Sequence, residues 1–169
     1  MIIIFGGLPG TGKTTLARAL AGELGACYVR VDTIEQALLA VAPGRPVGEA
    51  GYRIAFLIAE DNLRVGRSVV ADSVNPLSVT REAWRDVARR AGVASVEIEV
   101  VCSEAEEHRQ RVETRTADIP GHRLPSWQDV VRREYEPWSG DRLVIDTSGR
   151  DEEQSVAELM SALTRHLAR

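Results

Sequence analysis

The stretch from Ile2 to Thr15, IIIFGGLPGTGKTT, decides the fold. It joins an apolar run typical of a buried strand to the pattern GxxxxGK[ST] at residues 7–14, and a segment with the spacing of an amphipathic helix follows. Glycines let the backbone of such a loop turn its amide N–H groups inward, and the start of the next helix adds partial positive charge. The sequence therefore predicts a loop that wraps around phosphate groups.

Each residue of this loop has a predicted part in that site. Lys13 is the only lysine among the 21 basic residues of the chain, and its compact cation can reach the outer phosphates of a nucleotide. The hydroxyl of Thr14 can ligate Mg²⁺. The predicted nucleotide-binding residues are Gly7, Leu8, Pro9, Gly10, Thr11, Gly12, Lys13, Thr14 and Thr15.

The composition indicates one soluble globular domain over residues 1–169. Hydrophobic residues make up 44% and charged residues 27% of the chain, which excludes a disordered, fibrous or disulfide-stapled protein. No apolar run is long enough to span a bilayer, and the apolar start lacks the basic flank of a signal peptide. Cys27 and Cys102 suit free thiols in a reducing compartment, so we expect a cytoplasmic protein. The net charge of −4 disfavours non-specific binding of nucleic acid.

Short apolar runs alternate with helical periodicity along the whole chain. The clearest helix is the last, where Val156, Leu159, Leu163 and Leu167 form an apolar stripe. This alternation predicts an α/β fold with a parallel sheet covered by helices. The predicted strands are residues 2–5, 28–31, 68–72, 96–101 and 142–146.

The segment 103–118 breaks this pattern, because it has a helix start but almost nothing to bury. Ser103 and Glu106 have the spacing of a capping box, yet few apolar residues follow. A turn-rich stretch comes next, and Ser126 begins a second helix. These features predict a small helical lid over about residues 109–133.

Two absences narrow the reaction class. A second lysine, which the guanine-binding NKxD motif needs, is missing, and this disfavours a regulatory GTPase. The strand at 68–72 is followed by Ser73 instead of the glutamate that many ATPases use to activate water, and this weakens a hydrolase interpretation.

Four features follow one another along the chain: the loop at Gly7 to Thr15, Asp32 after the second strand, the stretch VADSVN at residues 70–75 and the arginine-rich region 109–133. This order resembles that of the small P-loop kinases. That group includes shikimate and gluconate kinases, antibiotic phosphotransferases and predicted kinases often labelled AAA family ATPases. The resemblance implies a three-layer P-loop NTPase fold with a five-stranded parallel sheet. It also implies ATP and Mg²⁺ as cofactors and transfer of the γ-phosphoryl group to an acceptor hydroxyl.

Asp32 is the predicted catalytic carboxylate. It comes at the carboxyl end of a strand, where open α/β sheets bind their ligands. In similar kinases an aspartate at this point orients or deprotonates the acceptor hydroxyl. The alternative is that Asp32 caps the next helix, since Asp32 and Glu35 have the spacing of a capping box.

Asp72 ends the next apolar strand and is the second predicted metal-binding residue beside Thr14. It could hold a water bound to Mg²⁺. The alternative is a residue that starts the turn before Asn75 and Pro76. Asn75 is a weaker candidate to face the acceptor.

Arg111 and Arg115 are the remaining predicted catalytic residues. They lie four residues apart on one face of the predicted lid helix, where a closing lid would bring them to the charge that develops on the transferred phosphoryl group. The alternative is a solvated helix in which Glu107 pairs with Arg111. The basic residues of this region are Arg109, Arg111, Arg115, Arg123, Arg132 and Arg133.

Other conspicuous residues have structural interpretations. We expect three arginines opposite the Trp84 stripe to lie on the surface: Arg81, Arg85 and Arg89. We expect the aromatic residues after the predicted lid to serve in packing: Trp127, Tyr135 and Trp138. The three histidines show no ligand or triad spacing, and no role is assigned to them.

Three functional hypotheses remain. The first is an ATP-dependent kinase that acts on a hydroxyl of a small-molecule substrate. The second is a kinase for the 5′-hydroxyl of a polynucleotide, which the net charge disfavours. The third is an assembly factor whose bound ATP orders a partner-binding surface without phosphorylating anything.

Overall fold

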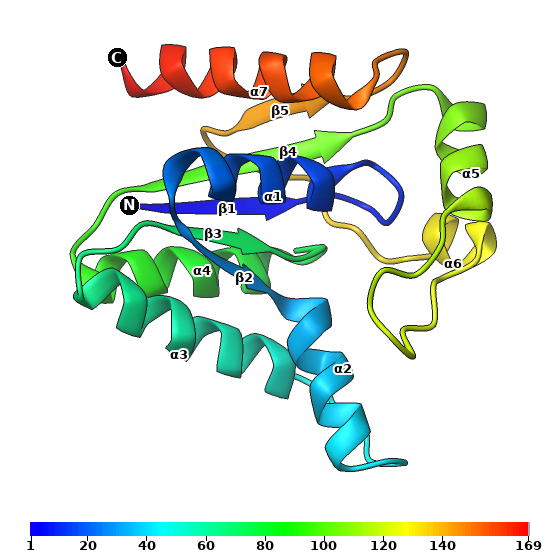
Figure 1. Ribbon diagram of the computed structural model, residues 1–169, viewed down its shortest axis with the longest axis horizontal. Coiled ribbons are helices and arrows are strands. Elements are labelled where there is room, and N and C mark those ends of the chain that lie inside the picture. The colour runs from blue at the N-terminus through cyan, green and yellow to red at the C-terminus, as the bar shows by residue number, and fades with distance from the viewer. Residues whose placement is uncertain (169) are drawn as a thin grey trace.

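The computed structural model describes residues 1–168 and is built around a five-stranded, all-parallel sheet with the order β2-β3-β1-β4-β5 (Figure 1). The strands are β1 (Ile2–Gly6), β2 (Cys27–Arg30), β3 (Val69–Asp72), β4 (Ser95–Val101) and β5 (Leu143–Asp146). The helices are α1 (Lys13–Leu24), α2 (Val31–Val41), α3 (Ala50–Arg64), α4 (Ser78–Ala91), α5 (Ala105–Thr114), α6 (Trp127–Val131) and α7 (Glu152–Leu167). The predicted fold class and all five predicted strands are confirmed.

The central strand β1 separates two hydrophobic cores. Successive side chains of a strand point to opposite faces of the sheet. Ile3 and Phe5 therefore pack under α1 and α7, whereas Ile2 and Ile4 pack against α3 and α4 on the other face (Figure 1). Because both faces are covered, the strand is a continuous apolar run, and the result is the three-layer arrangement that the sequence predicts.

Helices α5 and α6 lie at the carboxyl ends of the strands, beyond the loop that follows β1 (Figure 1). We call residues 105–131 the α5–α6 segment. Helix α5 does not begin as predicted, because its N-cap is Glu104, which accepts a hydrogen bond from the amide of Glu106, and not Ser103. The predicted start of the second helix at Ser126 is confirmed, since Ser126 and Asp129 form a capping box.

Arg81 corrects one prediction, because it is buried and not on the surface. Its side chain is 3% exposed and donates hydrogen bonds to the carbonyl oxygens of Glu136 and Pro137. Its guanidinium lies 4.8 Å from the ring centre of the buried Trp138. The helical periodicity of α4 correctly places Arg81 off the Trp84 stripe, but the later segment that contains Trp138 covers that face. The predicted packing role of Trp138 is confirmed.

Among residues 1–168, no helix is both long enough and apolar enough to cross a membrane.

Candidate active site

The loop between β1 and α1, residues 7–12, has a shape that only its glycines permit. Gly10 has φ +89°, and a Cβ there would lie 2.5 Å from Cγ2 of Val112 in α5. Gly12, with φ +86°, is the N-cap of α1 and offers no side chain to the first amides of that helix. These amides are therefore available to an anion at the helix N-terminus.

Lys13 lies where two cavities meet. The first, which we call the P-loop cavity, has a volume of about 470 Å³ and is lined by residues 10, 12–15, 18 and 30 and by the end of α5 and the residues after it. The second, which we call the α2 cavity, has about 650 Å³ and is lined by parts of α2, α3, the loop after β3 and the α5–α6 segment. Lys13 is 6% exposed, and it and Arg115 line both cavities.

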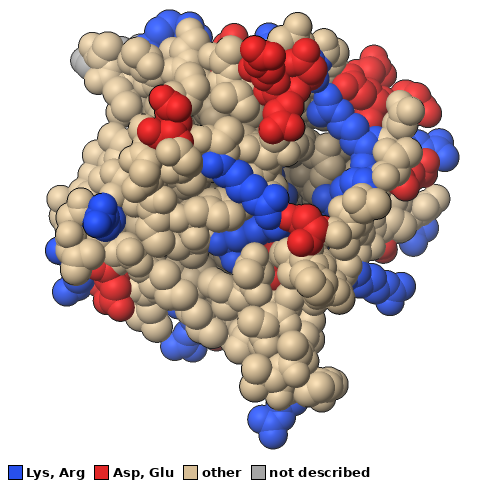
Figure 2. Space-filling model, in the orientation of Figure 1, with Lys and Arg blue, Asp and Glu red and all other residues tan. Residues whose placement is uncertain are grey.

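The P-loop cavity is strongly basic. Besides Lys13 and Arg115, it is lined by Arg18, Arg30 and Arg111. Figure 2 shows Lys and Arg side chains gathered around the hollow between the body of the molecule and α5. This concentration of positive charge suits a polyanion such as a nucleotide triphosphate.

Asp32 lines the α2 cavity, as expected for a group that faces an acceptor. The alternative that it caps a helix is wrong, because α2 already begins at Val31 and Arg30 is its N-cap. Asp32 lies in the first turn of α2, and its carboxylate is 3.7 Å from the guanidinium of Arg30. Asp32 therefore lies at the wall of the cavity and beside one buried cation.

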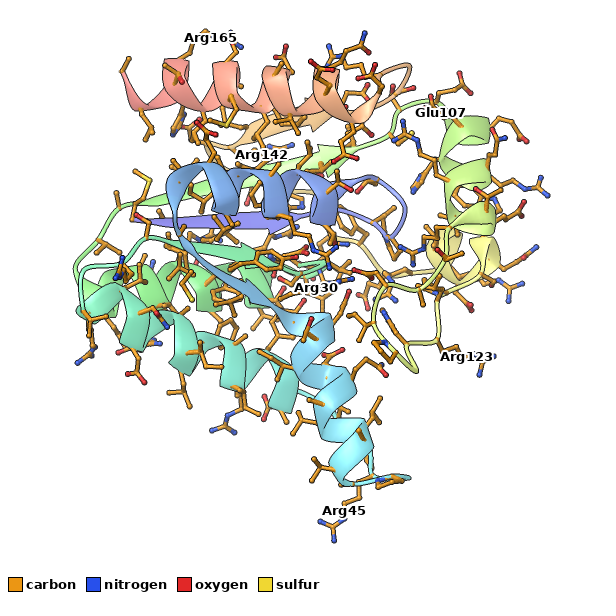
Figure 3. The ribbon with its side chains drawn as sticks, in the orientation of Figure 1. Arg30, Arg45, Glu107, Arg123, Arg142 and Arg165 are labelled. Atoms are coloured by element: carbon orange, nitrogen blue, oxygen red, sulfur yellow. The ribbon has the colours of Figure 1, made fainter. Side chains whose placement is uncertain are left out.

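Arg30 is a site residue that the sequence did not reveal. It ends β2, its side chain is 7% exposed, and it lies where that strand passes into α2 (Figure 3). Its two terminal nitrogens donate to Asp118 of the α5–α6 segment over 2.7 and 3.1 Å. Arg18 of α1 also donates to Asp118. These hydrogen bonds lower the pKa of Asp118, and they fasten the segment to the body of the protein.

Asp72 is almost completely buried, and its two carboxylate oxygens have different surroundings. One oxygen accepts a hydrogen bond of 2.6 Å from the hydroxyl of Tyr28 and lies 3.8 Å from Nε of Arg30. The other oxygen, Oδ1, is buried and has no hydrogen-bond partner among residues 1–168. A buried carboxylate oxygen without a donor is costly, and a water bound to Mg²⁺ would satisfy it. This free oxygen is compatible with the predicted metal role, although Asp72 lines neither of the two cavities.

The two predicted lid arginines lie in different places. Arg111 lines the P-loop cavity but not the α2 cavity, and it donates to Oγ1 and O of Thr147 over 2.8 and 2.9 Å. It also forms the ion pair with Glu107 that the alternative interpretation expects, at 2.5 Å. Arg115 lies between the two cavities, and its Nε is buried without a partner within the described chain. Burial lowers the pKa of Arg115, with Asp32 opposing this effect.

Two further residues have roles that differ from the sequence interpretation. His108, to which no role was assigned, is buried and makes a hydrogen bond of 2.9 Å through Nε2 to the carbonyl oxygen of Pro9. It therefore joins α5 to the P-loop. Asn75 does not face an acceptor, because it is fully buried and its amide donates to the carbonyl oxygen of Phe5.

The fold and the loop define a protein with the P-loop NTPase architecture. The chain belongs to the AAA_33 family, described as an AAA domain, whose sequence profile matches residues 2–133. A comparison with curated proteins gave no match.

Three solved structures show the same fold over nearly their whole length. A protein from Chloroflexus aurantiacus has 23% identity and a TM-score of 0.74, with 95% of this chain and 97% of that chain covered. A gluconokinase from Sinorhizobium meliloti has 19% identity and a TM-score of 0.68, with 96% and 91% covered. The Mycobacterium tuberculosis APS kinase CysC, in complex with AMPPNP and APS, has 18% identity and a TM-score of 0.69, with 96% of each chain covered. The chain therefore shares its fold with small P-loop kinases.

Proposed function

We propose that the protein is an ATP-dependent kinase that transfers the γ-phosphoryl group to a hydroxyl of a small molecule. The observation that carries this proposal is the pair of cavities that meet at Lys13 and Arg115. The P-loop cavity would hold the triphosphate, and the α2 cavity would hold the acceptor. A hydrolase needs space for only one water beside the γ-phosphate, whereas about 650 Å³ suits a second substrate.

The residues support an in-line transfer. The acceptor oxygen forms a bond to the γ-phosphorus, the bond between that phosphorus and the β–γ bridging oxygen breaks, and ADP leaves. Asp32 accepts the proton of the hydroxyl, while Lys13 and Arg115 stabilise the charge on the transferred group. Thr14 and Asp72 would hold Mg²⁺, which neutralises phosphate charge when it is bound.

The comparisons support a kinase through shared fold and through the printed activities of two neighbours, a gluconokinase and an APS kinase. The net charge of −4 favours a small acceptor over a polynucleotide. Cys27 and Cys102 are free thiols in the structure, which supports the proposed cytoplasmic location.

The test is to incubate the protein with γ-labelled ATP and a fractionated metabolite extract and to identify the compound that gains phosphate. Lys13→Ala should lower formation of this product by at least about 10²-fold, because no other side chain supplies a compact cation at the junction of the cavities. Arg109→Ala is the matched control, since Arg109 is an exposed cation that pairs with Glu113 on the outside of α5.

The control should form product at the wild-type rate. ATP hydrolysis without any labelled acceptor would contradict the kinase proposal and favour the assembly-factor hypothesis. Labelled oligonucleotide ends would instead show a polynucleotide kinase.

A further inference from the structure

The inner wall of the α2 cavity carries two carboxylates from one helix. Asp32 and Glu35 are three residues apart on α2, so they share one face of that helix, and both line the cavity. Residues with this spacing have Cβ atoms about 5–6 Å apart, so both carboxylates can contact neighbouring groups of one small molecule. The mechanism proposed above uses only Asp32. Glu35 is therefore a charged group in the cavity without an assigned role.

The neighbouring helix makes room for Glu35. A Cβ on Gly51, the second residue of α3, would lie 2.4 Å from Cγ and 2.9 Å from Oε1 of Glu35. Gly51 does not have a positive φ, so space and not backbone shape explains the glycine. The close approach of α3 holds the Glu35 side chain at the wall of the cavity.

Glu35 lacks a partner that would satisfy its charge. It is partly buried and has no ion pair within 4.0 Å in the described part of the chain. Burial raises the pKa of Glu35, and Asp32 adds to this effect while Arg133 opposes it. An ionised carboxylate only accepts hydrogen bonds, so a ligand that satisfies this wall must bring donors.

The cations of the α2 cavity are arranged differently from its carboxylates. Lys13 and Arg115 also face the P-loop cavity, where the nucleotide phosphates would engage them. Arg123 and Arg133 are exposed, and Arg123 extends outward from the loop between α5 and α6 (Figure 3). An anionic group placed beside α2 would therefore lie against the carboxylates of Asp32 and Glu35.

Another part of the cavity wall, formed by Ser73 and Tyr52, is polar and uncharged. The hydroxyl of Ser73 is 2% exposed and has no partner among residues 1–168, and it lines the cavity together with Tyr52. The hydroxyl of Tyr52 accepts a hydrogen bond from the amide of Asn75 over 3.3 Å. These hydroxyl groups can also form hydrogen bonds with a hydroxylated molecule.

We propose that the acceptor carries a second hydrogen-bond donor, a hydroxyl or an amino group, on the atom next to the hydroxyl that is phosphorylated, and that Glu35 recognises it. The acceptor is then a vicinal diol or an amino alcohol. Asp32 contacts the reacting hydroxyl and Glu35 contacts its neighbour. This inference rests on the proposed kinase function and names the substrate class of the same site.

The first test is the identity of the labelled product described above. A product with a hydroxyl or amino group on the atom next to the phosphate ester agrees with the inference. A product that lacks such a donor overturns the inference and leaves the kinase function intact. The absence of any product that depends on Lys13 overturns the kinase function, and this inference with it.

The second test compares that acceptor with its analogue in which hydrogen replaces the neighbouring donor. Wild-type protein should prefer the acceptor over the analogue by about 10- to 100-fold in kcat/KM. Glu35→Ala should reduce this preference to near unity, and Glu35→Gln, which keeps one acceptor oxygen, should retain part of it. ADP affinity and thermal unfolding should stay close to wild type in both variants. An unchanged preference in a folded Glu35→Ala variant would show that Glu35 is only structural.

A third variant moves Glu35 without changing it. Gly51→Ala should weaken the same preference, because the new Cβ occupies the position of the Glu35 side chain. Gly22→Ala is the matched control, since Gly22 is an exposed glycine of α1 with nothing within 4 Å of an added Cβ. The control should keep the full preference. Equal behaviour of the two variants would contradict the positioning role of Gly51.

Discussion

The P-loop cavity and the α2 cavity adjoin each other but are built in different ways. One wall of the P-loop cavity comes from nearly consecutive residues, 10 and 12–15, whose amides and one lysine provide the chemistry. The α2 cavity gathers single side chains from α2, α3, the loop after β3, α4 and the α5–α6 segment. A site made of consecutive backbone groups leaves a motif in the sequence. A site made of side chains from distant elements leaves none, although it determines what the protein acts on.

Replacing Asp32 tests whether the two cavities have separate tasks, and it should have the largest effect. Asp32→Asn keeps the size of the side chain but removes the proton acceptor from the α2 cavity. We expect the transfer rate to fall by about 10²- to 10⁴-fold while ADP affinity, measured by calorimetry, remains near wild type. Transfer at the normal rate would show that another group accepts the proton.

Arg111 of α5 and Arg115, which follows the end of that helix instead of lying on it as predicted, offer a smaller and finer test of the same comparison. Arg115 lines both cavities, so Arg115→Ala should lower kcat by about 10²-fold. Arg111 lines only the P-loop cavity of the two, so Arg111→Ala should mainly raise KM for ATP, by about 10-fold. Steady-state kinetics at saturating acceptor would distinguish these effects. The reverse pattern would place the transferred phosphoryl group beside Arg111.

Replacing Asp118 tests how the α5–α6 segment is held across the P-loop cavity. Of these replacements, this one should have the smallest effect. The side chain is 41% exposed, so water screens its pairs with Arg18 and Arg30, and Asp118→Asn should cost only about 1 kcal/mol at pH 7. The pKa of Asp118 is lower in the folded than in the unfolded protein. Its contribution is therefore complete above the ordinary aspartate pKa of about 4 and is lost as the pH falls toward the folded value.

Urea unfolding of the wild type and of Asp118→Asn would measure how much Asp118 contributes to the free energy of unfolding. The difference in the free energy of unfolding should be larger at pH 5 than at pH 3. A constant difference would mean that the charge of Asp118 does not stabilise the fold. Asp141→Asn, an exposed aspartate outside both cavities, is a suitable control.

The sequence predicted those features that depend on local pattern. Five apolar runs were sufficient for the sheet, and the glycines with Lys13 were sufficient for the phosphate loop. Helix α3 was not predicted, because its buried face consists largely of small residues, Gly51, Ala55 and Ala59, which give a weak apolar periodicity. The start of α2 was placed too late, because the helix follows β2 without a loop.

The contacts that hold the candidate site together could not be read from local pattern, because they join distant residues. Arg30 and Asp118 are 88 residues apart, and His108 and Pro9 are 99 apart. In its own segment, none of Arg30, His108 and Asp118 has a pattern that predicts such a contact. Arg81 was misassigned for the same reason, since the residues that bury it lie about 55 positions further along the chain.

The hydrogen bond between His108 and Pro9 has a mechanical consequence. Helix α5 rests on the phosphate loop itself, through His108 and through the contact of Val112 with Gly10, so a movement of this helix away from the loop would break both contacts. An opening that keeps these contacts would instead bend the chain after the end of α5, near Thr114. Such a bend would change the orientation of Arg115, which lines both cavities.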